Sequence, residues 1–170
     1  MRCIINIDEI ELPRRPAKYA APGEAAGRFD GRMGEVATRI GARKLGYNVT
    51  AVPPGKRAFP FHSHRINEEM FFILEGSGEV RIGTETHPLR AGDFIACPPG
   101  GPETAHQIVN TGTKELKYLA VSTLLYPEIC DYPDSGKFMV AEGQRDEHGN
   151  VSGFRYIGRT DSAVGYWDGE

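Results

Sequence analysis

The sequence predicts an all-β domain, and three observations carry that prediction. Glycine (21) and proline (12) make up about a fifth of the 170 residues, which disfavours a helical bundle. Strand-like runs recur about every ten residues between turn-forming residues. Helical periodicity is nearly absent between residues 35 and 125. A chain of this length suits one domain and needs no disulfide bonds to fold.

The first 34 residues predict an irregular N-terminal arm. Ile4, Ile5 and Ile7 could pair as a short edge strand, and residues 24–26 could form one helical turn. Proline and glycine recur from residue 13 to residue 34 and prevent any longer element.

From residue 35 onward the pattern changes to strands separated by turns. The predicted strands are 36–40, 44–52, 69–74, 79–82, 85–89, 93–97, 104–109 and 116–125. We expect a β-barrel over residues 35–142 and a C-terminal extension, residues 143–170, that packs on or near it. This extension would contain a late hairpin arm at 151–157, with Trp167 anchoring the tail.

The run at residues 69–74 predicts a strand that is covered on both sides. Phe71 and Ile73 would point one way, and Met70, Phe72 and Leu74 the other. Apolar residues on both faces are typical of a strand inside a sandwich or at a subunit interface. We therefore expect a homodimer.

Charge and cysteine content narrow the function classes. A formal net charge of -3 excludes a strongly basic nucleic-acid binder. The longest apolar run, residues 70–74, is far too short to span a membrane, and the first ten residues lack the apolar core of a signal peptide. Cys3, Cys97 and Cys130 form no C-x-x-C pair, and unpaired thiols favour a cytoplasmic location.

Three histidines and a pair of carboxylates form the candidate site. His62 and His64 are two residues apart, so on a strand both imidazoles point to the same face. Glu68 and Glu69 follow, and His106 comes later in the chain. Three neutral imidazoles and one carboxylate can hold a divalent first-row metal and leave a coordination position open.

Two segments around these residues resemble the paired signatures of the cupin superfamily. PGKRAFPFHSHRINEEMFFILEG resembles the first signature, with six residues rather than five between Gly55 and His62. GDFIACPPGGPETAHQIVN resembles the second, with five residues rather than two between Gly100 and His106. The resemblance covers roughly residues 35–125.

The resemblance implies a double-stranded β-helix, or jelly-roll barrel, with one divalent transition metal ion inside. The implied ligands are His62, His64, Glu69 and His106. On one regular strand, parity would favour Glu68 over Glu69, but a loop at residues 65–67 resets it, and the signature spacing favours Glu69. The ion could be Fe, Mn, Ni, Zn or Co.

The function implied by the resemblance is that of a metal-binding cupin enzyme acting on a small polar or anionic substrate. The segments HQIVNTGTKELKYLAVST and YPDSGK resemble sugar-phosphate-isomerase-like cupins. The alternatives are a non-catalytic small-molecule binding or sensing cupin and an Fe(II)-dependent dioxygenase. The binding cupin would act with or without the metal, and the dioxygenase would keep the metal but use a different co-substrate.

Other residues are assigned by position and chemistry. The candidate substrate-binding residues are Tyr47, Lys56, Arg57 and Phe71, with Arg65 as a further cation for an anionic group. No catalytic residue is singled out, although Glu68, Glu103 and Tyr47 could transfer a proton. We expect His87 and His148 in solvated turns and Cys97 as a small buried hydrophobe.

Overall fold

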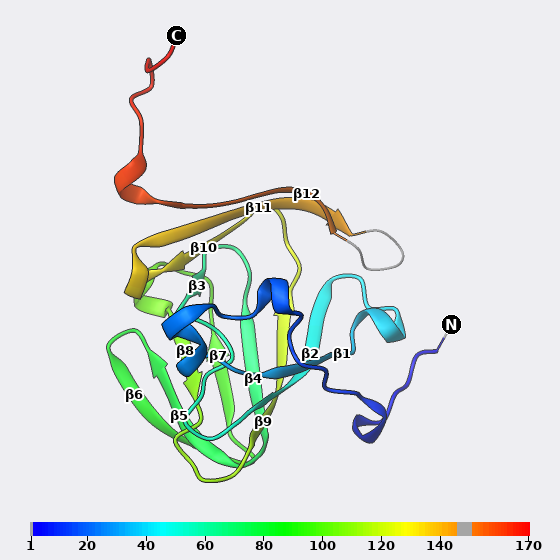
Figure 1. The fold of residues 1–170 in the computed structure, drawn as a ribbon. Helices are drawn as coiled ribbons and strands as arrows, with labels where there is room; N and C mark the ends of the chain where they lie inside the picture. Colours follow the sequence, from blue (N-terminus) through cyan, green and yellow to red (C-terminus); the bar gives the residue numbers. More distant parts are fainter. Residues whose placement is uncertain (1, 146–150) are drawn as a thin grey trace.

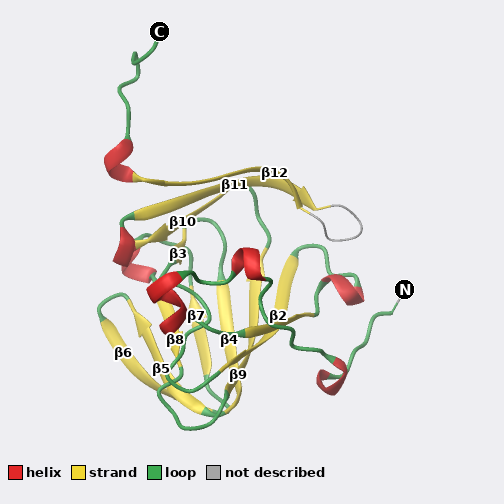
Figure 2. Cartoon of the chain, in the orientation of Figure 1, coloured by secondary structure: helices red, strands yellow, loops and turns green. Residues whose placement is uncertain are grey.

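The computed structural model describes residues 2–145 and 151–170, and its strands form an all-β jelly roll (Figures 1 and 2). The first sheet has five antiparallel strands in the order β1-β2-β9-β4-β7. Their bounds are β1 Arg32–Glu35, β2 Leu45–Val52, β9 Leu116–Thr123, β4 Glu69–Glu75 and β7 Phe94–Cys97.

Two smaller sheets lie opposite, and a pair of histidines joins them. The four-stranded sheet has the order β12-β11-β10-β3, with bounds Val151–Arg159, Lys137–Arg145, Glu128–Tyr132 and Ser63–His64. The three-stranded sheet has the order β6-β5-β8, with bounds Glu85–Arg90, Ser77–Ile82 and His106–Val109. The backbones of His62 and His106 exchange two hydrogen bonds, of 2.8 and 3.2 Å, across the seam between these sheets.

Strand alternation sorts the five-stranded sheet into an inner and an outer face. Phe71 and Ile73 of β4 point inward, and their register partners Ala120 and Tyr118 lie on the same buried face. The core between the sheets contains Val52, Ala58, Phe71, Ile73, Val80, Leu89, Ile95, Cys97, Ile108, Leu116, Tyr118 and Ala120. Removing this apolar surface from water is the main stabilising contribution, roughly 25 cal/mol per Å².

The N-terminal arm follows the sheet edge in short 3-10 helices, at Ile7–Glu9, Ala17–Tyr19 and Gly23–Gly27. The expected strand at Ile4, Ile5 and Ile7 is wrong, because a capping box between Asn6 and Glu9 starts a 3-10 helix there. The predicted turn at residues 24–26 is confirmed.

Close packing of the arm depends on a glycine in β1. A Cβ atom at Gly34 would overlap Ile10 Cγ2 and the Glu11 carbonyl oxygen. Only glycine therefore lets this part of the arm pass so near the strand.

The predicted strands from residue 44 to residue 125 are confirmed, with bounds that shift by one or two residues. The strand expected at 36–40 is wrong, because the chain turns through a 3-10 helix, Thr38–Ile40, that ends at Gly41 with a φ of 82°. Strands β10 and β11 were not expected. Further 3-10 helices lie at Pro102–Thr104, Pro133–Ser135 and Thr160–Ser162.

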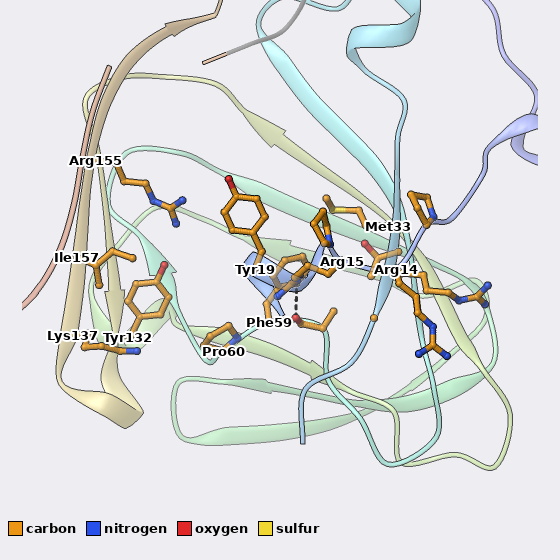
Figure 3. Close-up of a pocket in the computed structure, with 16 residues that line it drawn as sticks. Arg14, Arg15, Tyr19, Met33, Phe59, Pro60, Tyr132, Lys137, Arg155 and Ile157 are labelled. Carbon is orange, nitrogen blue, oxygen red and sulfur yellow. Dashed lines mark hydrogen bonds between the residues drawn. The ribbon is translucent and has the colours of Figure 1, made fainter. Parts of the chain in front are cut away.

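The long β11–β12 hairpin crosses the boundary placed at residue 143 and lies over one end of the molecule (Figure 1). Beyond it the C-terminal tail extends away from the body, and Trp167 is 76% exposed, so the expected anchor is wrong. Between the hairpin and the N-terminal arm lies a cavity of about 570 Å³ (Figure 3). No helix among the described residues is long and apolar enough to cross a membrane.

Candidate metal centre

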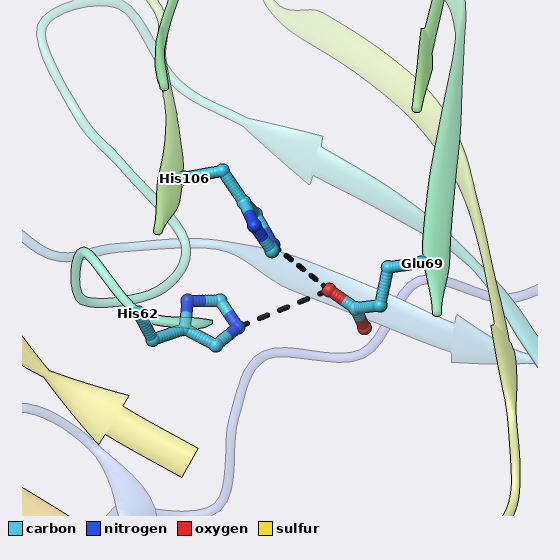
Figure 4. A group of neighbouring side chains, drawn as sticks. All are labelled: His62, Glu69 and His106. Atoms are coloured by element: carbon cyan, nitrogen blue, oxygen red, sulfur yellow. Dashed lines mark hydrogen bonds and ion pairs between the residues drawn. The ribbon is translucent and has the colours of Figure 1, made fainter. Parts of the chain in front are cut away.

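The structure brings together all four residues that the cupin signatures singled out. His62 precedes β3, His64 ends it, and Glu69 and His106 are the first residues of β4 and β8. Glu69 Oε2 lies 3.0 Å from His106 Nε2, 3.5 Å from His64 Nε2 and 3.9 Å from His62 Nε2. Figure 4 shows the imidazoles of His62 and His106 pointing at this oxygen. Three ring nitrogens thus converge on one carboxylate oxygen.

The pleat of β4 decides which of the two neighbouring glutamates points inward. Glu69 is in register with Cys97 and Ser122, and it shares the inner face of the sheet with Phe71. Glu68 lies before the strand begins and is exposed. The geometry therefore groups Glu69 with the histidines.

Each histidine presents Nε2 to the centre because its Nδ1 faces another partner. His62 Nδ1 lies 2.8 Å from the Pro60 carbonyl oxygen, and His106 Nδ1 lies 3.4 Å from that of Thr104. His64 Nδ1 lies 3.3 Å from Cys130 Sγ. Partners at Nδ1 fix the ring orientation and the tautomer, and they leave the Nε2 lone pair free for an ion.

A buried carboxylate on β10, Glu128, lies on the Nδ1 side of the His64 ring, away from the centre. Its Oε2 lies 3.6 Å from His64 Nδ1 and accepts a hydrogen bond from the Asn67 backbone at 3.0 Å. The Ile129 backbone donates to its other oxygen at 2.8 Å, and the Asn67 side chain also donates to this carboxylate. Sequence reasoning missed Glu128 and Cys130, since no motif marks β10.

Burial and neighbouring charges shift the pKa of the histidines in opposite directions. Burial, followed by the neighbouring His106, lowers the pKa of His62 to about 4. Burial also acts to lower the pKa of His64, but contacts with Cys130, Glu128 and Glu69 outweigh it and raise that pKa to about 12. A metal ion bound at Nε2 would therefore displace a proton from His64.

The carboxylate at the centre keeps its negative charge. Burial acts to raise the pKa of Glu69, but the contacts with His106 and His64 outweigh it and hold this pKa below its usual range. Burial and the nearby Glu69 charge raise the pKa of the Cys97 thiol to about 12. Cys97 is 3% exposed, as expected of a small buried hydrophobe.

These donors fit a divalent first-row metal ion. Imidazole nitrogens and a carboxylate oxygen are suitable ligands for Fe, Mn, Co, Ni and Zn. His64 Nε2 is buried and has no hydrogen-bond partner among the described residues, as a ligand atom awaiting an ion would be. His62, Glu69 and His106 offer ligand atoms within 4.8 Å of one another.

Of the four predicted substrate-binding residues, Phe71 lies beside this centre and the other three lie away from it. Tyr47 is in register with Val121 and Met70, so it lies on the outer face, opposite Glu69. Lys56 Nζ donates to the Gly27 carbonyl, and the Arg57 guanidinium lies 5.8 Å from the Phe29 ring centre. Phe71 is a core residue whose ring centre lies 5.5 Å from that of His106.

The remaining candidates also have defined places. Arg65 forms a bidentate ion pair with Asp131, with N–O distances of 2.8 and 3.2 Å. The Glu103 carboxylate is exposed and accepts a hydrogen bond from the Gly101 backbone. His87 is exposed on β6, within the Glu85–Arg90 strand rather than in a turn, and His148 lies outside the described residues.

A comparison with protein families identifies the segment that contains this site. The family model described as "Cupin domain" matches residues 48–122, which contain all four converging residues. The chain contains a cupin domain. The match omits the N-terminal arm and strands β10–β12, so the cupin domain accounts for the centre and not for what surrounds it.

Two curated relatives share the cupin segment. An uncharacterized protein of Methanocaldococcus jannaschii is 38% identical over 82 residues, which are 48% of this chain and 55% of that protein. An oxalate-binding protein of Thermotoga maritima is 35% identical over 74 residues, 44% of this chain and 58% of that protein. The chain thus spans little more than half the length of these relatives.

A solved structure matches beyond the cupin segment. It is described as a sugar phosphate isomerase from a cupin superfamily, from Silicibacter pomeroyi, and is 24% identical with a TM-score of 0.77. The match covers 97% of this chain and 98% of that one. At this identity the likeness shows a shared fold, which includes the arm and the C-terminal hairpin.

Proposed function

We propose that this cupin binds one divalent transition metal ion through His62, His64, Glu69 and His106. The observation that carries the proposal is the convergence of three imidazole Nε2 atoms on Glu69 Oε2, with His64 Nε2 buried and without a hydrogen-bond partner among the described residues. Four protein ligands leave one or two positions of a five- or six-coordinate ion for a substrate oxygen.

The proposed activity is that of a metal-dependent enzyme acting on a small polar or anionic substrate, of the sugar-phosphate-isomerase-like kind. The bound ion would polarise a substrate oxygen as a Lewis acid. The chain's own residues orient the ligand set: the Pro60 and Thr104 carbonyls hold two imidazoles, and Glu128 holds His64. The buried core around Phe71 excludes water from one side of the centre and strengthens charge interactions there.

Elemental analysis of protein purified without added metal tests this proposal. We expect about one transition metal ion per chain, and a sharp loss of metal in His64→Ala with the β-sheet circular dichroism spectrum retained. His87→Ala is the matched control, because that imidazole is exposed and outside the centre. Unchanged metal content in His64→Ala would contradict the ligand assignment.

A second candidate is a binding cupin that holds a small anion without turnover. The oxalate-binding relative from Thermotoga maritima favours it. Titration of the metal-loaded protein with oxalate, followed by product analysis, separates the two. Binding with no change in the ligand over many hours supports the binding protein, and conversion of a phosphorylated sugar supports the enzyme.

We also propose a homodimer through the outer face of the five-stranded sheet. Met70 and Phe72 lie on this face, and the Phe72 ring centre lies 4.4 Å from that of Phe94, which is 72% exposed. Register partners Leu119, Val121 and Ala96 continue the same uncharged rows. Because the patch is uncharged and apolar, the same patch on a second copy suits it, as in a two-fold interface.

A further inference from the structure

The cavity between the N-terminal arm and the β11–β12 hairpin has the size of a small-molecule site. Its volume of about 570 Å³ falls within the range of ligand pockets. The described residues that line it are Pro13, Arg14, Arg15, Pro16, Tyr19, Gly31, Arg32, Met33, Thr50, Ala58, Phe59, Pro60, Tyr132, Lys137, Arg155 and Ile157. Figure 3 shows Tyr132, Lys137 and Arg155 on the hairpin side, and Tyr19 and Arg15 on the arm side.

This lining is strongly basic. Five of the lining residues are Arg or Lys, and none of those described is Asp or Glu. Arg65 and Arg81, on other parts of the surface, are paired with Asp131 and Asp134. Of the five, Arg32 is paired with Glu115.

The other cations have no carboxylate partner in the described part of the chain. Arg15 donates one hydrogen bond to the Ala58 carbonyl at 3.1 Å and lies 5.0 Å from the Phe59 ring centre. Arg155 Nε lies 3.1 Å from Met139 Sδ, which leaves the terminal nitrogens of its guanidinium available. Lys137 Nζ lies 5.7 Å from the Tyr132 ring centre. Several uncompensated positive charges in one concave site attract an anion.

The cavity adjoins the metal centre through its own lining residues. The Tyr132 ring stacks on His62, with ring centres 6.2 Å apart, and the Pro60 carbonyl accepts the hydrogen bond from His62 Nδ1. Thr50, also in the lining, belongs to the inner row of β2, opposite Tyr118. A ligand in the cavity would therefore lie against the groups that orient His62.

We propose that this cavity binds a small organic anion of the phosphate-ester class, with the phosphate held by Arg155, Lys137 and Arg15 and the body packed on Phe59 and Tyr132. The proposal names the substrate class and its subsite, and it rests on the proposed function only for the role of the neighbouring metal. Of the proposed binding groups, Arg15, Tyr132, Lys137 and Arg155 lie outside the matched cupin segment and Phe59 lies inside it. They come from the arm, β10, the β11–β12 hairpin and the loop at residues 58–60.

Calorimetric titration of protein treated with EDTA tests the pocket apart from the metal. The probes are glucose 6-phosphate, inorganic phosphate and glucose. We expect glucose 6-phosphate to bind most tightly, because only it satisfies both the cations and the aromatic rings. Arg155→Gln and Lys137→Gln should each weaken its binding about tenfold or more, as expected for the loss of a charge-assisted hydrogen bond.

Arg90→Gln is the matched control, since it removes the same charge from exposed Arg90 on β6, a strand that contributes nothing to the described lining. Binding in this variant should stay within about twofold of the parent. Equal binding of glucose and glucose 6-phosphate, no binding of glucose 6-phosphate, or equal effects of Arg155→Gln and Arg90→Gln would overturn the proposal.

His64→Ala separates the pocket from the metal centre. If this variant loses metal and still binds glucose 6-phosphate, both proposals stand. If the parent protein holds no metal and yet shows the charge-dependent binding, the metal proposal fails and the pocket stands.

Discussion

At the scale of single residues, the buried carboxylate of Glu128 matters because of the ligand it positions. It accepts hydrogen bonds from three backbone N–H groups and from the Asn67 side chain, and it lies 3.6 Å from His64 Nδ1. We expect Glu128→Gln to weaken metal binding roughly 10- to 100-fold, as is typical when the partner of a ligating histidine is lost. Competition with a chromophoric chelator measures this affinity.

A control variant tests whether the effect depends on where the lost carboxylate lies. Glu85→Gln removes a carboxylate whose side chain is 75% exposed and lies 3.3 Å from the non-ligand His87. It should leave metal affinity unchanged. If both variants bind metal as the parent does, Glu128 is a structural residue only.

At the scale of elements, the N-terminal arm packs so closely against β1 that position 34 has no room for a side chain. A Gly34→Val substitution should displace the segment around Ile10 and Glu11 from β1. We expect faster tryptic cleavage after Arg14, and weaker binding of glucose 6-phosphate in the adjoining cavity. Gly27→Ala is the control, because a Cβ atom there meets nothing within 4 Å. Equal cleavage rates in the two variants would contradict this account of the arm.

The strands from β2 to β9 could be predicted because their signals are local. Alternating apolar residues and glycine-rich turns lie within the segments they specify. The local signals failed at Val36 and Ala37, which are buried without forming a strand. They also failed at β10, which pairs with β11 and with the distant β3. Glu128 could not be found from sequence, since its partner Asn67 lies 61 residues away.

The candidate site was predictable for a different reason. His62 and His64 were marked by their spacing of two residues, and His106 was a candidate as a third histidine. The signature spacing of the resemblance then selected Glu69 over Glu68 and grouped it with the histidines. The basic cavity was beyond reach, because its cations come from the arm and from a hairpin whose first strand had no clear pattern. The cations that were predicted, Lys56, Arg57 and Arg65, instead contact Gly27, Phe29 and Asp131.

At the scale of the whole molecule, the apolar outer face makes the proposed homodimer testable. Phe94→Ser should raise the dimer dissociation constant by about tenfold or more, since it removes a large exposed ring from the patch. Sedimentation velocity over a range of concentrations measures this. Phe154→Ser, which removes another exposed ring on β12, should have no effect. A parent protein that stays monomeric at every concentration would end the proposal.

The reciprocal backbone pair between His62 and His106 has a consequence for local opening of the fold. These two residues join the four-stranded and three-stranded sheets, and their side chains face the same carboxylate oxygen. An ion held by both imidazoles would oppose separation of the two backbones. At a free metal concentration 100 times the dissociation constant, this linkage is worth about 2.7 kcal/mol. Hydrogen exchange should therefore slow at the amides of His62 and His106 when metal is added, while exchange in the β11–β12 hairpin stays the same. Equal slowing at all amides would mean that the ion acts on global unfolding. The seam between the two sheets would then not open separately from the rest of the jelly roll.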